Sequence, residues 1–590
     1  MQDKNRDNYF IYLFEISPFI IGLSSIYTHL LFGAVLAIGL LIYIHAQKHI
    51  HIYRNPSLYA GGLILIGGLL SIPFGMDPGT SFEGLLILLS GLIFTLFIMQ
   101  FDPKDREMML RTLPETGAIL VLLCGFLYLF PVTKDFLFVS NRLNGFFQYA
   151  NTMALYLLLC LTYFLLGQDT DNGSGKNTKK GRRNLYVSLR SYLLPGILMA
   201  GILWTGSRST FVLMLAVILY AAIRRKGLRL SVGILTVLIL GLSILYVAVS
   251  GRMSSIGRFL TISGKESTLI GRFLYWEDAL PVILKHPFGL GYLGYDQMQT
   301  SFQHGLYAVK YVHNEYLQCF LDYGWIAGVG FLWLLIHNLR KSRGIYRIML
   351  IVMMLHMLMD MDLQFFPMIY FLLITMSWTE GKHTDIHWVD AKNLPKWKKA
   401  PEPEEIHGKR IVTGISAAML VGILLSIWVG AADLIDYAGH PDVAQGIYPF
   451  EYNYALKQMY AATSYEEAEP YANQVLALNP YNAMAYGLKA NAAKDRHDYK
   501  EMVKYLNLEL EHAPYQMNPH KAAVTSLIEG IEYCDSEKKA TDRKLLVDTL
   551  KQIPKRLEQT QQTTNPLAYQ IKDKPVLKLS DEVMKYIESL

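Results

Sequence analysis

The chain has 590 residues, of which 52% are hydrophobic and only 18% are charged. A soluble chain carries about 25% charged residues, so the composition excludes an ordinary soluble protein. The net charge of +6 does not indicate nucleic-acid binding, because the basic excess lies in loops between apolar runs. No metal-ligand spacing or disulfide framework is visible among the four cysteines, which we interpret as packed residues. They are Cys124, Cys160, Cys319 and Cys534.

Apolar runs of nearly 20 residues recur through residues 1–431, and each is long enough to cross a hydrocarbon core of about 30 Å. We predict about thirteen membrane spans. They lie at 10–27, 29–46, 58–75, 82–100, 114–131, 148–167, 192–205, 207–223, 230–250, 318–336, 345–359, 365–379 and 411–431. The first lacks a small-residue cleavage site, so we expect a retained helix and not a signal peptide.

The loops between these spans differ in charge from one face to the other. Most of their lysines and arginines fall on the face that holds the N-terminus. The positive-inside rule makes that face cytoplasmic. Alternation of the spans then predicts an external long loop at 251–317 and an external domain at 432–590.

The C-terminal domain has a different pattern. A helical stretch that begins near Tyr465 leads to Asn479-Pro480, and another that begins at Tyr499 leads to Ala513-Pro514. The two prolines are 34 residues apart, which is the period of tetratricopeptide repeats. Only two repeats are legible. We therefore predict a tetratricopeptide-like helical domain, and two roles stay open: a surface that holds a partner or acceptor, or a capping structural module.

Unusual polar residues concentrate at the external boundary of the predicted spans. They are Arg142, Asn151, Arg208, Arg258, Arg272, His286, His313 and Asn314. Arginine offers a planar set of donors suited to phosphate oxygens, and an imidazole can act as a general base near neutral pH. This boundary is therefore the predicted site for a diphosphate whose lipid tail stays in the bilayer.

Each of these residues also has a purely structural interpretation. Arg208 could extend to lipid headgroups, Arg272 could be solvated on an amphipathic helix, and His313 could be an ordinary interfacial residue. His286, before a proline, is favoured as a turn element. Asp360 and Asp362 fit a polar hairpin between two short spans better than a cation site. No Walker-type loop indicates ATP hydrolysis, and the spans lack the buried ionisable residues of an ion relay.

Residues from about 140 to 378 resemble the O-antigen ligase and O-antigen polymerase superfamily of bacterial envelope enzymes. The motifs that carry the resemblance are Arg142…Gly145…Asn151, Gly206-Ser207-Arg208, Gly271-Arg272…Trp276, His286-Pro287-Phe288-Gly289-Leu290-Gly291 and His313-Asn314-Glu315-Tyr316-Leu317-Gln318. The resemblance implies an all-α, polytopic, GT-C-like glycosyltransferase of the bacterial cytoplasmic membrane. It also implies a polyprenyl-diphosphate-linked glycan as donor, with no nucleotide cofactor and no obligatory metal.

The resemblance assigns functional roles to Arg208, Arg272 and His313. We expect the two arginines to hold the diphosphate and His313 to take the acceptor's proton, so that the sugar carbon is attacked with inversion. The other residues expected to bind substrate are Arg142, Asn151, Arg258, His286 and Asn314. Ligation to a lipid, protein or glycan acceptor is the first expectation, because the helical domain offers a docking surface. A repeat-unit polymerase and a non-enzymatic transporter of lipid-linked glycans remain alternatives.

Overall fold

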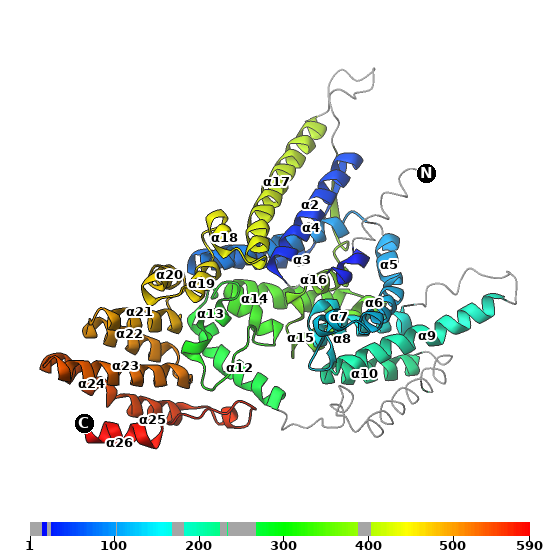
Figure 1. The fold of residues 1–590 in the computed structure, drawn as a ribbon. Helices are drawn as coiled ribbons and strands as arrows, with labels where there is room; N and C mark the ends of the chain where they lie inside the picture. Colours follow the sequence, from blue (N-terminus) through cyan, green and yellow to red (C-terminus); the bar gives the residue numbers. More distant parts are fainter. Residues whose placement is uncertain are drawn as a thin grey trace.

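The computed structural model describes residues 14–20, 25–101, 103–167, 182–224, 233, 267–387 and 403–590. The described chain is almost entirely helical (Figure 1), which confirms the predicted all-α class. The candidate residue Arg258 and all of the predicted span at 230–250 except Gly233 lie outside the described residues.

Six described segments are long and apolar enough to cross a membrane, and three further apolar helices are shorter. The long ones are α2 (Ile26–Gln47), α3 (Pro56–Phe74), α4 (Pro78–Ile98), α14 (Glu315–Lys341), α17 (Pro403–Tyr437) and Arg106–Leu127, which joins α5 (Pro103–Arg111) to α6 (Leu113–Leu127). The shorter ones belong to α8 (Ala150–Leu166), α9 (Arg182–Thr205) and α15 (Gly344–Met357). These helices coincide with predicted spans, which supports a multi-pass membrane protein. The count of thirteen stays a prediction.

Further short elements complete the membrane region. They are η1 (Ser17–Phe19), α7 (Pro131–Leu137), η2 (Gly145–Phe147), α10 (Arg208–Arg224), η6 (Asp362–Gln364) and α16 (Phe366–Ile374). Sequence explains where several helices begin. Asn55 and Asp77 cap α3 and α4 by accepting hydrogen bonds from backbone N–H groups two residues on. Each cap is followed by proline, whose fixed φ suits the first helical position.

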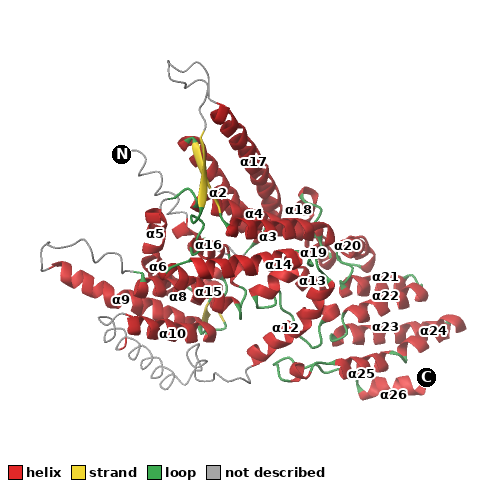
Figure 2. Cartoon of the chain, turned by 180° about the vertical axis from the view of Figure 1, so that it is seen from behind, coloured by secondary structure: helices red, strands yellow, loops and turns green. Residues whose placement is uncertain are grey.

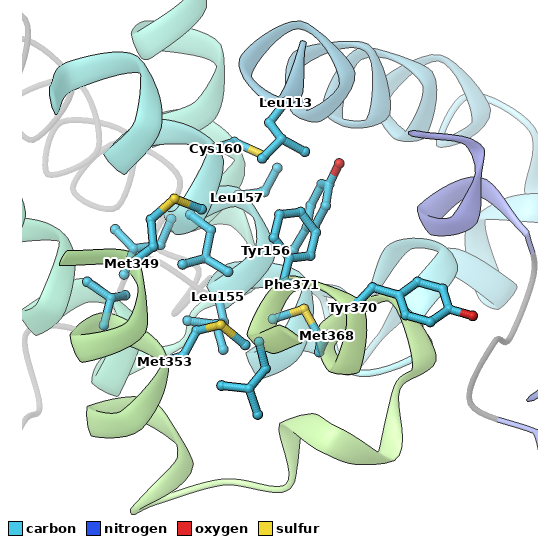
Figure 3. Packing of buried hydrophobic residues seen from close by; sticks show 14 of the residues in the cluster. Leu113, Leu155, Tyr156, Leu157, Cys160, Met349, Met353, Met368, Tyr370 and Phe371 are labelled. Atoms are coloured by element: carbon cyan, nitrogen blue, oxygen red, sulfur yellow. The ribbon is translucent and has the colours of Figure 1, made fainter. Parts of the chain in front are cut away.

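The main hydrophobic core surrounds α8 (Figure 3). Nearly every side chain of α8 is buried, and the helix packs against α6, α9, α10 and α15. Tyr156 of α8 meets Phe371 of α16 with ring centroids 5.4 Å apart. Cys160, also on α8, is fully buried and free, as expected of a packed cysteine. This rigid centre carries the short segments on its boundary that hold the candidate site.

Two small antiparallel sheets occur where the sequence predicted loops. β1 (His49–Arg54) pairs with β4 (Lys382–His387), and β2 (Phe138–Val139) pairs with β3 (Arg142–Leu143). The β1–β4 pair joins segments more than 300 residues apart, so neither strand could be recognised from its local sequence. The β2–β3 hairpin holds the backbone of Arg142 shortly before α8.

The predicted long loop contains two helices, α12 (Ser267–Lys285) and α13 (Gly294–Phe302). Between them, the turn that contains Gly289 packs on a kink in α14 at Gly324. Both glycines have positive φ, +84° and +76°. A Cβ on Gly289 would lie 2.6 Å from the Asp322 carbonyl oxygen, so no larger residue fits there.

The C-terminal region is a stack of helices (Figure 2). The helices are α18 (Pro441–Ile447), α19 (Tyr452–Ala461), α20 (Tyr465–Leu478), α21 (Ala483–Asp495), α22 (Tyr499–His512), α23 (Met517–Ser536), α24 (Ala540–Leu550), α25 (Ile553–Thr563), η8 (Pro566–Tyr569) and α26 (Asp581–Ser589). α20 and α22 end just before Asn479-Pro480 and Ala513-Pro514, where the sequence predicted. The tetratricopeptide assignment stays a prediction.

The helical stack contacts the start and the middle of α12. Asn565 donates a hydrogen bond from Nδ2 to Glu277 Oε2 (2.5 Å), and its backbone N–H bonds the His304 carbonyl (2.9 Å). The Lys572 backbone N–H donates to Ser267 Oγ at 2.7 Å. In both views α12 lies between the stack and α10 (Figures 1 and 2). The stack therefore braces the helix that carries Arg272.

Candidate active site

A cavity of about 370 Å³ opens at the boundary of the membrane region. It is lined by Arg142, Tyr149, Asn151, Gly206, Arg208, Ser209, Val212, Thr268, Leu269, Arg272, Tyr275, His313 and Met359. These residues come from segments that are distant in sequence: the entrance of α8, the α9–α10 turn, α12, the residues before α14, and the link after α15. Five of the eight predicted site residues meet here.

Arg208 is the first residue of α10 and lines the cavity. The chain turns from α9 into α10 at Gly206, whose φ of +64° is in the left-handed region that glycine adopts without strain. Two residues beyond Arg208, Thr210 Oγ1 lies 3.0 Å from His356 Nε2, and His356 Nδ1 lies 2.6 Å from Asp362 Oδ2. This buried chain of hydrogen bonds fixes the start of α10 and thereby the position of Arg208.

Asp360 is the centre of the site. Its fully buried carboxylate accepts from Arg272 Nη2 at 3.1 Å, from Asn151 Nδ2 at 2.6 Å and from the Tyr149 hydroxyl at 2.7 Å. Both oxygens are therefore used, and two cavity-lining segments, the entrance of α8 and α12, are tied to one group. Burial by itself would raise the pKa of Asp360, but Arg272 and His313 beside it hold that pKa below its ordinary value.

Arg142 belongs to the same network. Its Nε donates to the Thr205 carbonyl at 2.7 Å, and its Nη2 donates to Asn151 Oδ1 at 2.7 Å. Asn151 in turn donates a hydrogen bond from Nδ2 to Asp360. The guanidinium of Arg142 thus joins the end of α9 to the start of α8, and it contributes positive charge to the cavity wall.

His313 has an unusual backbone conformation, with φ of +52°. Neighbouring hydrogen bonds hold it: the Val312 N–H donates to Gln318 Oε1 (2.9 Å), and Trp276 Nε1 donates to the Val312 carbonyl (3.1 Å). The imidazole Nδ1 lies 3.4 Å from Asp360 Oδ1. A tautomer that donates Nδ1–H to Asp360 keeps the Nε2 lone pair available to accept a proton. A non-glycine residue held at positive φ is typical of functional sites.

The charges at the cavity favour an anion. Arg142, Arg208 and Arg272 line it, and Asp360 forms an ion pair with Arg272. Positively charged groups that line a cavity attract anions, and guanidinium groups are well suited to phosphate oxygens.

Two predicted residues, His286 and Asn314, do not line the cavity. His286 lies in the turn after α12, where its carbonyl accepts from the Gly289 N–H at 3.0 Å. Asn314 caps α14 by accepting from the N–H groups of Tyr316 and Leu317, and its Nδ2 donates to the Leu358 carbonyl. Its bond to Leu358 holds the α15–α16 link near α14. Arg258 is outside the described residues, so its role stays a prediction.

The sequence reasoning missed the central carboxylate. Asp360 and Asp362 were interpreted as a polar hairpin, yet Asp360 joins the site network and Asp362 anchors His356. Two acids between short apolar helices were the available signal, because ionisable residues at the membrane are costly and usually functional. Tyr149 was also missed, since a tyrosine at a helix entrance is common at membrane boundaries.

Comparison with known proteins found one family match. Residues 194–332 match a family model described as O-Antigen ligase. The matched segment contains Arg208, Arg272 and His313. No match was found among the curated proteins. This match supports the resemblance predicted from the motifs, over residues 194–332 of the chain.

Proposed function

We propose that the protein transfers a glycan from a polyprenyl-diphosphate-linked donor to an acceptor at the outer face of a bacterial cytoplasmic membrane. The family match is consistent with a ligase-like or polymerase-like membrane glycosyltransferase. The single observation that carries the proposal is the grouping of Arg208, Arg272 and His313 around one cavity. A diphosphate binder and a candidate base are needed together for this reaction.

The arginines would bind the donor's diphosphate. Arg272 is held by one Nη2 contact to Asp360, so its remaining N–H groups are available to phosphate oxygens. Arg208 enters the cavity from the opposite segment, at the start of α10. Negative charge grows on the diphosphate as the glycosidic bond breaks. Two guanidinium groups fixed in advance would stabilise that charge more than they stabilise the ground state.

His313 would serve as the general base. The acceptor hydroxyl oxygen attacks the anomeric carbon, and its proton passes to Nε2 of His313. The bond from that carbon to the diphosphate oxygen breaks, and the lipid diphosphate leaves with the electron pair. Attack from the face opposite the leaving group inverts the anomeric centre. Asp360 would stabilise the imidazolium that forms, because its carboxylate faces Nδ1.

The acceptor would bind next to the helical stack. The stack contacts the start and the middle of α12, the helix of Arg272, so an acceptor docked there would lie beside the cavity. This placement favours ligation over polymerisation. The acceptor class is a lipid, protein or glycan that presents a free hydroxyl.

Analysis of lipid-linked glycans in a deletion strain tests the function. Accumulation of the full-length glycan on its polyprenyl carrier is expected for a ligase, and accumulation of single repeat units would instead identify a polymerase. An unchanged lipid-linked pool would contradict both. Complementation with wild-type protein should clear the pool. His313→Ala should not, and His286→Ala, a histidine outside the cavity, provides the matched control.

A further inference from the structure

Three buried carboxylates converge where the helical stack joins the membrane helices. Glu83 lies near the start of α4, Asp433 near the end of α17, and Glu451 immediately before α19. One oxygen from each lies within 4.8 Å of the others. All three residues are buried, and Glu83 is fully so, with 0% exposed. The group therefore brings together two membrane helices and the first helices of the stack.

These carboxylates have few hydrogen-bond donors. Neither oxygen of Glu83 has a hydrogen-bond partner in the described structure. Asp433 Oδ1 accepts from the Tyr454 hydroxyl (2.5 Å) and Glu451 Oε1 from Asn453 Nδ2 (2.6 Å), but the second oxygen of each has no partner there. Within the described ranges, no lysine or arginine forms an ion pair with any of the three. Four carboxylate oxygens are thus buried without the donors that normally accompany such groups.

Such a group must bind protons or a cation, because three unpaired negative charges in a buried site are very costly. The ligand set is all oxygen, which suits a hard divalent ion. Calcium binds oxygens at about 2.3–2.6 Å, so two oxygens on opposite sides of one ion lie about 5 Å apart. The observed spacing fits that limit. Magnesium usually keeps several waters and demands a regular octahedron, which a buried carboxylate group supplies less readily.

We propose that Glu83, Asp433 and Glu451 bind a calcium ion that fastens the helical stack to the membrane helices. The contact between the start of α4 and the segment before α19 is closely packed. The Tyr448 hydroxyl donates to the Gly79 carbonyl at 2.9 Å, and a Cβ on Gly79 would lie 2.3 Å from the Phe450 carbonyl oxygen. The ion cancels the repulsion among the three acids and so stabilises this approach of α4 to the segment before α19.

Calcium titration of the purified full chain tests the proposal. After chelator treatment, calorimetry should detect one calcium ion per chain. At a calcium concentration about 100-fold above the dissociation constant, the unfolding midpoint of the full chain should rise by roughly 2 °C. Amide exchange should slow in residues 441–461, which contain α18 and α19. Absence of binding, or binding without these two effects, overturns the proposal.

Matched variants separate this site from non-specific effects. Glu83→Gln removes one ligand charge, so the calcium response should disappear while the chelated protein becomes no less stable. Asp433→Asn should behave alike, and its amide oxygen can still accept from Tyr454. Glu466→Gln removes the same charge from an exposed position on α20 and should keep the full response. A response that Glu83→Gln and Asp433→Asn retain, or that Glu466→Gln loses, contradicts the assignment.

Discussion

The molecule contains two buried acidic centres with opposite surroundings. Asp360 is contacted by Arg272, His313, Asn151 and Tyr149, so its charge is balanced and its oxygens are bonded. Among the residues described, Glu83, Asp433 and Glu451 form no ion pair with a lysine or arginine and have too few hydrogen-bond donors. A carboxylate that is surrounded by cations organises a site for an anion, whereas carboxylates that are buried together create a site for a cation. Neighbouring groups, more than residue type, decide the chemistry.

Replacing the central carboxylate should have the largest effect. Asp360→Asn keeps the shape but leaves Arg272, which is only 16% exposed, without its ion-pair partner. Breaking a buried pair costs about 3–5 kcal/mol, and three segments lose their common anchor. We expect a fall in the unfolding midpoint and near-complete loss of transfer.

Thermal unfolding and product formation on one preparation would check this prediction. Asp135→Asn, on the exposed surface of α7, is the matched control and should behave like wild type. Full activity of Asp360→Asn would mean that the carboxylate is not the organising centre.

Substitutions of Arg208 test whether the cavity binds an anion. Arg208→Ala should reduce transfer by about 10²–10³-fold if the guanidinium stabilises charge in the transition state. Arg208→Lys retains the charge but loses the planar donors, so it should recover only part of the activity. Initial rates at several donor concentrations would separate binding from turnover. Wild-type rates in both variants would leave Arg208 as a membrane-interface anchor.

Much of the fold can be predicted from the sequence, because each apolar run of sufficient length predicts one membrane helix without reference to the rest of the chain. The ends of α2, α14 and α15 lie within a few residues of their predicted spans. The β1–β4 pairing does not follow, since it depends on two segments meeting through the whole fold. The same limit applies to Asp360. Its residue type gives no sign that α8, α12 and the segment before α14 converge on it.

The helical stack also contains a buried carboxyl group, that of Glu509. Glu509 on α22 is 8% exposed, and burial raises its pKa to about 8. A raised carboxyl pKa means that the folded state binds the proton more tightly than the unfolded chain. Its stabilising effect is therefore complete below pH of about 4.5 and is lost as pH rises through about 8. We expect stability to fall across that window by at most about 1.4 kcal/mol per pH unit.

Glu509→Gln should flatten this pH dependence, because the amide cannot ionise. Amide exchange of α21 and α22 at pH 5 and pH 8, corrected for the intrinsic rate, would measure it. An equal pH dependence in wild type and variant would show that Glu509 is ionised in the folded protein at both values.

The smallest effect is expected at His286. This residue lies in the turn that packs on the kink of α14 and does not line the cavity. His286→Ala should change transfer by no more than about twofold. A loss comparable with that of Arg208→Ala would place His286 in the substrate path and would require the turn to move toward the cavity.

The central claim is that the arginines bind the lipid diphosphate while His313 accepts the proton. Reconstituted His313→Ala with a lipid-linked glycan donor tests it most directly, with donor affinity and single-turnover product formation measured on the same sample. The account predicts unchanged donor affinity and a loss of transfer of about 10²–10⁴-fold. Wild-type transfer at saturating donor, or a loss confined to donor affinity, would contradict the role of His313 as the base.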